Sequence, residues 1–67
     1  MSKTYQVMNV DCKGIKLICI YDTTAKWNPY KLYQKSYDNG WHRKKITEYT
    51  DFQSVLYHLV ENYDFRR

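Results

Sequence analysis

The sequence predicts an α+β fold: a four-stranded antiparallel β-meander with one C-terminal amphipathic α-helix packed on one face (ββββα). Two observations carry this prediction. Residues 4–49 contain four runs rich in β-branched and aromatic residues, separated by turn residues, and residues 52–63 repeat apolar side chains at helical spacing. The chain has 67 residues, and we expect residues 1–67 to form a single small domain.

The first two strands are predicted at 4–10 ("TYQVMNV") and 15–22 ("IKLICIYD"), with "DCKG" at 11–14 as the turn between them. The second run is apolar on both alternating faces, one made of Leu17 and Cys19 and the other of Ile18 and Ile20. A strand that is buried on both faces is usually interior to its sheet. Residues 23–29 follow as a loop, because the Asn28-Pro29 pair breaks any regular pattern.

The third and fourth strands, 30–37 and 41–49, flank the turn sequence "DNG", which allows two registers. A two-residue loop of Asn39 and Gly40 opposes Tyr33 to Ile46 and Lys35 to Lys44. A three-residue loop that includes Asp38, with Gly40 left-handed, opposes Tyr37 to Trp41 and Leu32 to Ile46.

We favour the three-residue loop because it sorts the hairpin into two chemically distinct faces. The apolar face consists of Tyr30, Leu32 and Ile46. The basic-aromatic face consists of Lys31, Tyr33, Lys35, Tyr37, Trp41, Arg43 and Lys45. This register also creates a cross-strand aromatic pair, which contributes about 0.2–1 kcal/mol.

The C-terminal helix is predicted from six apolar residues that occupy an arc of about 140° at 100° per residue. These residues are Phe52, Val55, Leu56, Leu59, Val60 and Tyr63. Thr50, with Gln53 three positions later, has the spacing of a capping box at the helix start. Since one short helix cannot cover both faces of four strands, we expect a second sheet face to remain.

The positive charge is concentrated in the loop and the second hairpin. Residues 26–45 carry six basic residues and one acidic residue, a charge of +5, while the rest of the chain carries −1, so the net charge of +4 comes entirely from this segment. Cations that neutralise phosphates, beside rings that stack on bases for about 1–3 kcal/mol each, are typical of single-stranded nucleic-acid sites. Lysines on a hairpin can also simply keep a sheet edge soluble. The sequence contains no RNP-type aromatic motif and no basic recognition helix.

No pattern in the chain predicts catalysis, a metal or a cofactor, and we expect none of the three. Cys12, Cys19, His42 and His58 form no CxxC or His-x₃-His pair. Both histidines are interpreted as surface residues, with His58 on the solvent side of the helix and Glu61 as its surface neighbour. Cys19 lies in an apolar strand, where burial disfavours the thiolate. Both glycines are explained by turns, so no Gly-rich phosphate loop is present.

The predicted location is the cytoplasm, without membrane contact. The N-terminus "MSKTYQVMNV" has no apolar signal-peptide region, and the apolar run "LICIY" at 17–21 is too short to cross a bilayer. In a reducing compartment the two cysteines are expected to be free thiols.

A protein interface is the alternative to nucleic acid, because Tyr, Trp and Arg dominate interface hot spots. The same aromatic sheet surface would then serve a small adaptor or a homodimer. Trp27 offers a third arrangement, in which it folds back from the loop and closes the free sheet face within one chain.

The segments "YDTTAKWNPYKLYQKSYDNGWHRKKI" and "DFQSVLYHLVENY" resemble short uncharacterised proteins carried on mobile genetic elements of clostridia. The resemblance spans about Ile15 to Tyr63. It implies a cytoplasmic bacterial accessory protein encoded near genes for DNA transfer, and it assigns no role to any residue.

The leading hypothesis from the sequence is a non-enzymatic binding module whose hairpin contacts single-stranded nucleic acid. In this hypothesis Lys31, Lys35, Arg43 and Lys45 neutralise phosphates, and Tyr33, Tyr37 and Trp41 stack on bases.

Overall fold

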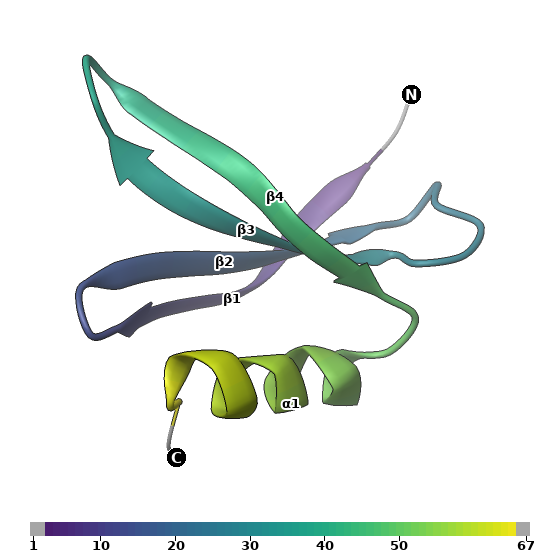
Figure 1. Cartoon of the computed structure of the whole chain (residues 1–67). Coiled ribbons are helices and arrows are strands. Elements are labelled where there is room, and N and C mark those ends of the chain that lie inside the picture. Colours follow the sequence, from purple (N-terminus) through teal and green to yellow (C-terminus); the bar gives the residue numbers. More distant parts are fainter. Residues whose placement is uncertain (1–2, 66–67) are drawn as a thin grey trace.

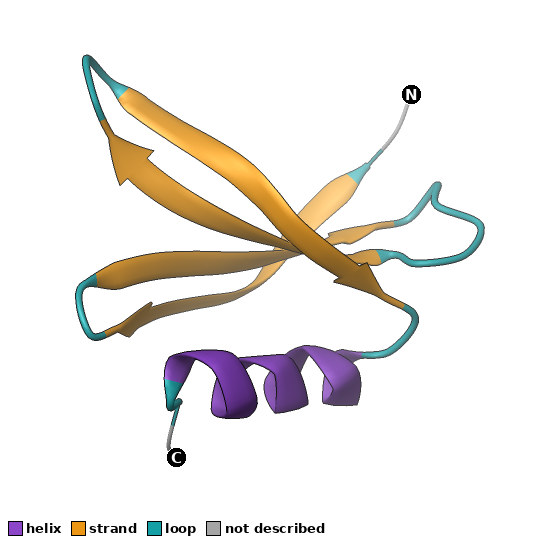
Figure 2. Ribbon diagram, viewed as in Figure 1, coloured by secondary structure: helices purple, strands orange, loops and turns teal. Residues whose placement is uncertain are grey.

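A computed structural model describes residues 3–65. It contains strands β1 (Thr4–Cys12), β2 (Ile15–Asp22), β3 (Tyr30–Tyr37) and β4 (Trp41–Tyr49), followed by helix α1 (Phe52–Tyr63). The strands form one antiparallel sheet in the order β1-β2-β3-β4, and α1 lies across one face of it (Figures 1 and 2). The predicted ββββα architecture is confirmed.

Strand β2 occupies the interior of the sheet, as its two apolar faces predict. Leu17 and Cys19 are fully buried beneath α1, where they pack with Leu32, Val55 and Leu59. Ile18 and Ile20 point to the opposite face and are buried there, outside the helix-side cluster. We call this opposite side the open face, because α1 does not cover it.

The first turn is shorter than predicted, since Asp11 and Cys12 belong to β1 and pair with Lys16 and Ile15. Lys13 and Gly14 make the turn with positive φ angles of 55° and 84°. Two successive residues with positive φ give a turn whose twist matches that of the flanking strands, so the ladder continues up to it. The Gly14 amide also donates to Asp11 Oδ1 at 2.9 Å.

The second hairpin has the three-residue loop. Tyr37 pairs with Trp41, and Asn39 and Gly40 both adopt positive φ, at 56° and 118°. The predicted pairing of Leu32 with Ile46 is wrong, because a β-bulge shifts the register and Leu32 pairs with Thr47. A bulge places two residues of one strand opposite one residue of its partner, and Ile46 still packs against the helix-side core.

Helix α1 begins one residue later than the predicted capping box. Asp51 is the N-cap, with extended backbone, and its side chain accepts a hydrogen bond from the Ser54 amide at 2.8 Å. The Thr50 hydroxyl instead donates to Asn28 Oδ1 at 3.0 Å, which joins the end of β4 to the loop at residues 23–29.

The helix is also rotated relative to its apolar arc. Val55 and Leu59 are fully buried, but Val60 is 50% exposed, contrary to the prediction. His58 was predicted to face solvent, yet it is partly buried, with its Nδ1 2.9 Å from the Tyr49 hydroxyl. Val60 and His58 lie about 100° to either side of Leu59. The Tyr49 contact therefore draws the His58 flank inward and turns the Val60 flank outward.

Trp27 does not close the open face, because its side chain is 79% exposed in the loop. The alternative in which Trp27 acts as an intramolecular lid is therefore wrong. Within residues 3–65, no helix has the length and apolar character that crossing a membrane requires.

Candidate nucleic-acid interface

The seven residues of the predicted basic-aromatic face all lie on the open face. Tyr37 is paired with Trp41 and Lys35 with Arg43 across the hairpin. Directly paired residues share a face, and alternation along β3 adds the remaining members. The residues brought together are Lys31, Tyr33, Lys35, Tyr37, Trp41, Arg43 and Lys45. Leu32, between them in sequence, is buried on the helix side.

Trp41 is the centre of a cation–aromatic cluster. The Lys35 ammonium lies 5.1 Å from the Trp41 ring centroid, and the Lys16 ammonium lies 4.8 Å from it. Tyr37 packs edge-on against the same ring at 5.3 Å between centroids, with an interplanar angle of 71°. Since Tyr37 and Trp41 remain 70% and 56% exposed, their rings are available to a partner.

Lys16 was not among the predicted site residues, although it belongs to this cluster. It is directly paired with Lys35 across β2 and β3. That pairing depends on the register between the two strands, which are joined by an irregular loop at residues 23–29. Hairpin loops of defined turn type specify register, but a loop of this length does not. The local sequence around Lys16 therefore contains no signal for its role.

A second cation–aromatic contact lies beside the first. The Arg43 guanidinium carbon is 5.1 Å from the centroid of the Tyr33 ring. Tyr33 in turn is paired with Ile18 of β2 and Lys45 of β4. Ile18 is only 3% exposed, so the side chains around it cover the apolar centre of the open face. The open face is thus a basic and aromatic surface over a small apolar floor.

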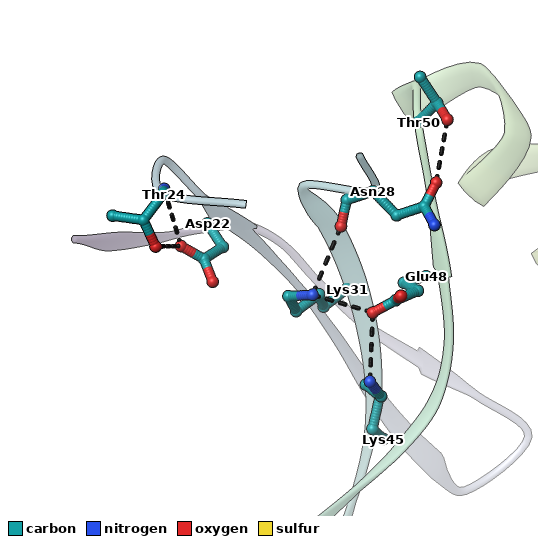
Figure 3. A network of polar contacts seen from close by, with 7 residues as sticks. All are labelled: Asp22, Thr24, Asn28, Lys31, Lys45, Glu48 and Thr50. Atoms are coloured by element: carbon teal, nitrogen blue, oxygen red, sulfur yellow. Dashed lines mark hydrogen bonds and ion pairs between the residues drawn. The ribbon is translucent and has the colours of Figure 1, made fainter. Parts of the chain in front are cut away.

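Two of the four predicted phosphate ligands are held by a carboxylate. Glu48 Oε2 accepts from Lys31 Nζ at 2.9 Å and from Lys45 Nζ at 3.1 Å (Figure 3). The hydrogen bond from Lys31, followed by that from Lys45, lowers the pKa of Glu48 to about 2. The bond to Glu48 correspondingly raises the pKa of Lys31, whose side chain is only 21% exposed.

The same network anchors the loop at residues 23–29. Lys31 Nζ also donates to the Asn28 carbonyl at 3.4 Å, and Asn28 Oδ1 accepts from Thr50 (Figure 3). At the loop's start, Asp22 Oδ1 accepts from the amide and the hydroxyl of Thr24, and these bonds lower the pKa of Asp22. Lys31 is therefore chiefly a structural residue of the sheet end.

The uncompensated positive charge of the open face lies at the other end of the hairpin. Within the described part of the chain, Lys16, Lys35 and Arg43 form no ion pair with a carboxylate. Their charges are instead arranged around the Trp41 and Tyr33 rings. The candidate interface is thus shifted toward the hairpin tip relative to the predicted set.

A groove opens between Trp41 and the edge strand β1. Its volume is about 310 Å³, and its lining residues are Asn9, Val10, Asp11, Lys16, Lys35 and Trp41. The carboxylate of Asp11 in this groove is oriented by the bond that it accepts from Gly14.

The chemistry of the remaining candidate groups is limited. Cys12 and Cys19 are buried free thiols, and burial raises the pKa of Cys19 to about 11. A thiolate, which is the nucleophilic and metal-binding form, is therefore disfavoured at Cys19. Among residues 3–65, no group of three or more His, Cys, Asp or Glu side chains is placed to hold a metal ion.

Comparison of the chain with protein-family models, curated proteins and solved structures finds no match.

Proposed function

We propose that this protein is a non-enzymatic binding module that contacts single-stranded nucleic acid through its open face. The observation that carries the proposal is the cluster in which Lys16 and Lys35 lie within about 5 Å of the exposed Trp41 ring. A cation beside an exposed ring can neutralise a phosphate while the ring stacks on the neighbouring base.

The arrangement favours a single strand over a duplex. Stacking on Tyr37 or Trp41 requires an unpaired base, whose ring face is accessible. A helix that reads a duplex enters its major groove. Helix α1 instead covers the core side of the sheet (Figure 1), whereas the basic cluster lies on the open face.

The ion pairs decide which basic residues are available to bind phosphate. Lys16, Lys35 and Arg43 are the phosphate ligands, while Lys31 is engaged with Glu48 and Asn28. Lys45 is half exposed and shared with Glu48, so its contribution to phosphate binding is smaller.

Fluorescence anisotropy with a labelled single-stranded oligonucleotide tests the proposal. Three phosphate contacts predict a slope of about −2 in a plot of log affinity against log salt concentration. Lys35→Ala should weaken binding and make the slope shallower by about 0.7. Lys44→Ala is the matched control, because Lys44 lies in the same hairpin, on strand β4, but pairs with Gln34 on the other face.

A second matched pair of variants tests the contribution of the aromatic residues to binding. Trp41→Leu should reduce affinity about fivefold or more, as expected for the loss of one stacked base. Trp27→Leu removes the other tryptophan, which is 79% exposed in the loop, and should leave affinity unchanged. Absence of binding at low salt, or equal losses in the two members of either pair, would refute the proposal.

A protein partner is the second candidate, favoured by the packed and exposed pair of Tyr37 and Trp41. Such preorganised aromatic residues are typical of interface hot spots. If the partner is a second copy of the chain, light scattering will give a dimer mass that Trp41→Ala reduces and Lys35→Ala does not. A monomer mass at high concentration excludes the homodimer.

We infer a cytoplasmic location as part of the same proposal, and we assign the protein to the accessory proteins of mobile genetic elements. The two free cysteines support the location, because thiols persist in reducing compartments. The resemblance of residues 15–63 to such accessory proteins supports the assignment.

A further inference from the structure

Asp11 introduces a negative charge into a surface that otherwise suits a polyanion. The residue pairs with Lys16 across β1 and β2, and Lys16 pairs with Lys35 across β2 and β3. The three residues therefore form one row across neighbouring strands, which are about 4.8 Å apart. Trp41 lies over this row, and all four residues line the groove.

The Asp11 side chain is held in place but keeps capacity to accept further hydrogen bonds. Its Oδ1 accepts from the Gly14 amide at 2.9 Å, and no ion pair joins it to Lys16 among the described residues. An ionised carboxylate accepts about four hydrogen bonds through its two oxygens and donates none. It repels a phosphate, so the part of a nucleic-acid strand that lies against Asp11 must be an uncharged group that is rich in donors.

Among the bases, guanine alone presents two adjacent donors on its Watson–Crick edge, the N1–H and the N2 amino group. Adenine and cytosine place one amino donor beside a ring nitrogen that accepts. Uracil and thymine place one N–H between two carbonyl oxygens. A carboxylate can therefore form a paired contact with guanine, but it meets an acceptor on every other base.

We propose that the groove beside Trp41 is a guanine subsite, in which the base lies against the Trp41 ring and its Watson–Crick edge faces Asp11. The inference rests on the proposed function, because the strand's phosphates bind Lys16, Lys35 and Arg43. Asn9, at the same wall of the groove, supplies an amide that can bond a further polar atom of the base.

The test compares three labelled 12-residue DNA strands: thymidine only, thymidine with one central deoxyguanosine, and the same strand with deoxyinosine in place of guanosine. A single guanine cannot assemble a quadruplex. The protein should prefer the guanine strand over the thymidine strand by about five- to tenfold, the lower part of the range for a bidentate base contact. The inosine strand, which lacks the N2 amino group, should bind with intermediate affinity.

Asp11→Asn is the informative variant, because the asparagine oxygen can still accept from Gly14 while the second carboxylate oxygen and the charge are lost. It should abolish the preference for guanine and leave binding of the thymidine strand unchanged or tighter. Asp38→Asn removes the same charge in the hairpin loop, outside the groove, and should preserve the preference.

The outcomes separate the two proposals. If no strand binds at low salt, the proposed function fails and the guanine subsite fails with it. If all three strands bind equally, and binding still depends on Lys35 and Trp41, only the guanine subsite is refuted. If Asp11→Asn tightens binding of all three strands by the same factor, Asp11 merely repels phosphate, and the subsite is again refuted.

Discussion

Glu48 departs furthest among the described acidic residues from an ordinary surface carboxylate, because one of its oxygens accepts hydrogen bonds from two lysines. Its pKa falls to about 2, from an ordinary value of 4.5. A group whose pKa is lowered by folding stabilises the native state above its unfolded pKa. That contribution disappears as the pH falls toward the folded pKa.

Glu48→Gln is therefore expected to lower the free energy of unfolding at pH 7, and its effect should shrink as the pH falls from 4.5 to 2. Urea denaturation followed by tryptophan fluorescence, at several pH values and low salt, measures the difference between the two proteins. Glu61→Gln, on the exposed helix surface, is the control and should have little effect at any pH. A Glu48→Gln deficit that stayed constant down to pH 2 would contradict the ion-pair explanation.

Leu59 and Val60 are adjacent helix residues with opposite environments, at 0% and 50% exposure. Leu59→Ala should cost about 2–5 kcal/mol in the free energy of unfolding, because it leaves a cavity in the core. Val60→Ala should change it by only about 0.5 kcal/mol, as is usual for surface positions. Urea denaturation of both variants checks the rotation of the helix. Comparable losses in the free energy of unfolding would indicate that Val60 is buried and would contradict the rotation.

At the scale of the element, the start of α1 depends on a side chain rather than on the apolar pattern. Asp51 satisfies the Ser54 amide, one of the helix-terminal N–H groups that have no partner within the helix. This hydrogen bond lowers the pKa of Asp51. The Thr50 hydroxyl bonds outside the helix, to Asn28.

Asp51→Ala should destabilise the protein by about 1 kcal/mol, the usual loss on removing an N-cap. Thr50→Ala removes a surface hydrogen bond and should cost less. Thermal unfolding by circular dichroism ranks the two variants. The reverse order would support the capping box that was predicted at Thr50.

At the scale of the whole molecule, helix α1 covers one side of the sheet, the core side, and leaves the other side open (Figure 2). Cys19 lies at the centre of the core side, in an interior strand, and is fully buried. Its thiol is protected twice, by the absence of solvent access and by a pKa raised to about 11.

Alkylation of Cys19 by iodoacetamide should therefore require global unfolding. Mass spectrometry of the modified protein should show that Leu59→Ala accelerates this reaction by the same factor by which it increases the unfolded fraction. Val60→Ala should leave the rate nearly unchanged. A Cys19 rate that is insensitive to Leu59→Ala would indicate that β2 opens locally.

The features predicted from sequence are those encoded by neighbouring residues. The loop at Asp38-Asn39-Gly40 and the alternation of the strands around it were enough to predict the pairing of Tyr37 with Trp41. The bulge that leaves Ile46 out of register was not predictable from local sequence. It depends on how β4 fits the twist of the sheet while Ile46 packs against the core beneath α1.

The sequence predicted which residues share the face of the candidate site, but it did not predict which of its basic residues form ion pairs. All seven residues share the open face, since alternation alone places them there. The bulge brings Glu48 opposite Lys31, and Glu48 also contacts Lys45, three residues earlier on the same strand. Lys16 reaches Trp41 through the register between β2 and β3, which no local pattern specifies.

Local patterns in the chain specify the meander, the hairpin and the basic-aromatic surface, because backbone alternation and turn conformations act over a few residues. Contacts between distant segments decide which lysines remain uncompensated, that Asp11 and Trp41 line one groove, and that His58 rather than Val60 turns toward the sheet. These outcomes depend on side chains from separate strands meeting in space. Whether such contacts form depends on the arrangement of the whole chain, which no local stretch of residues encodes.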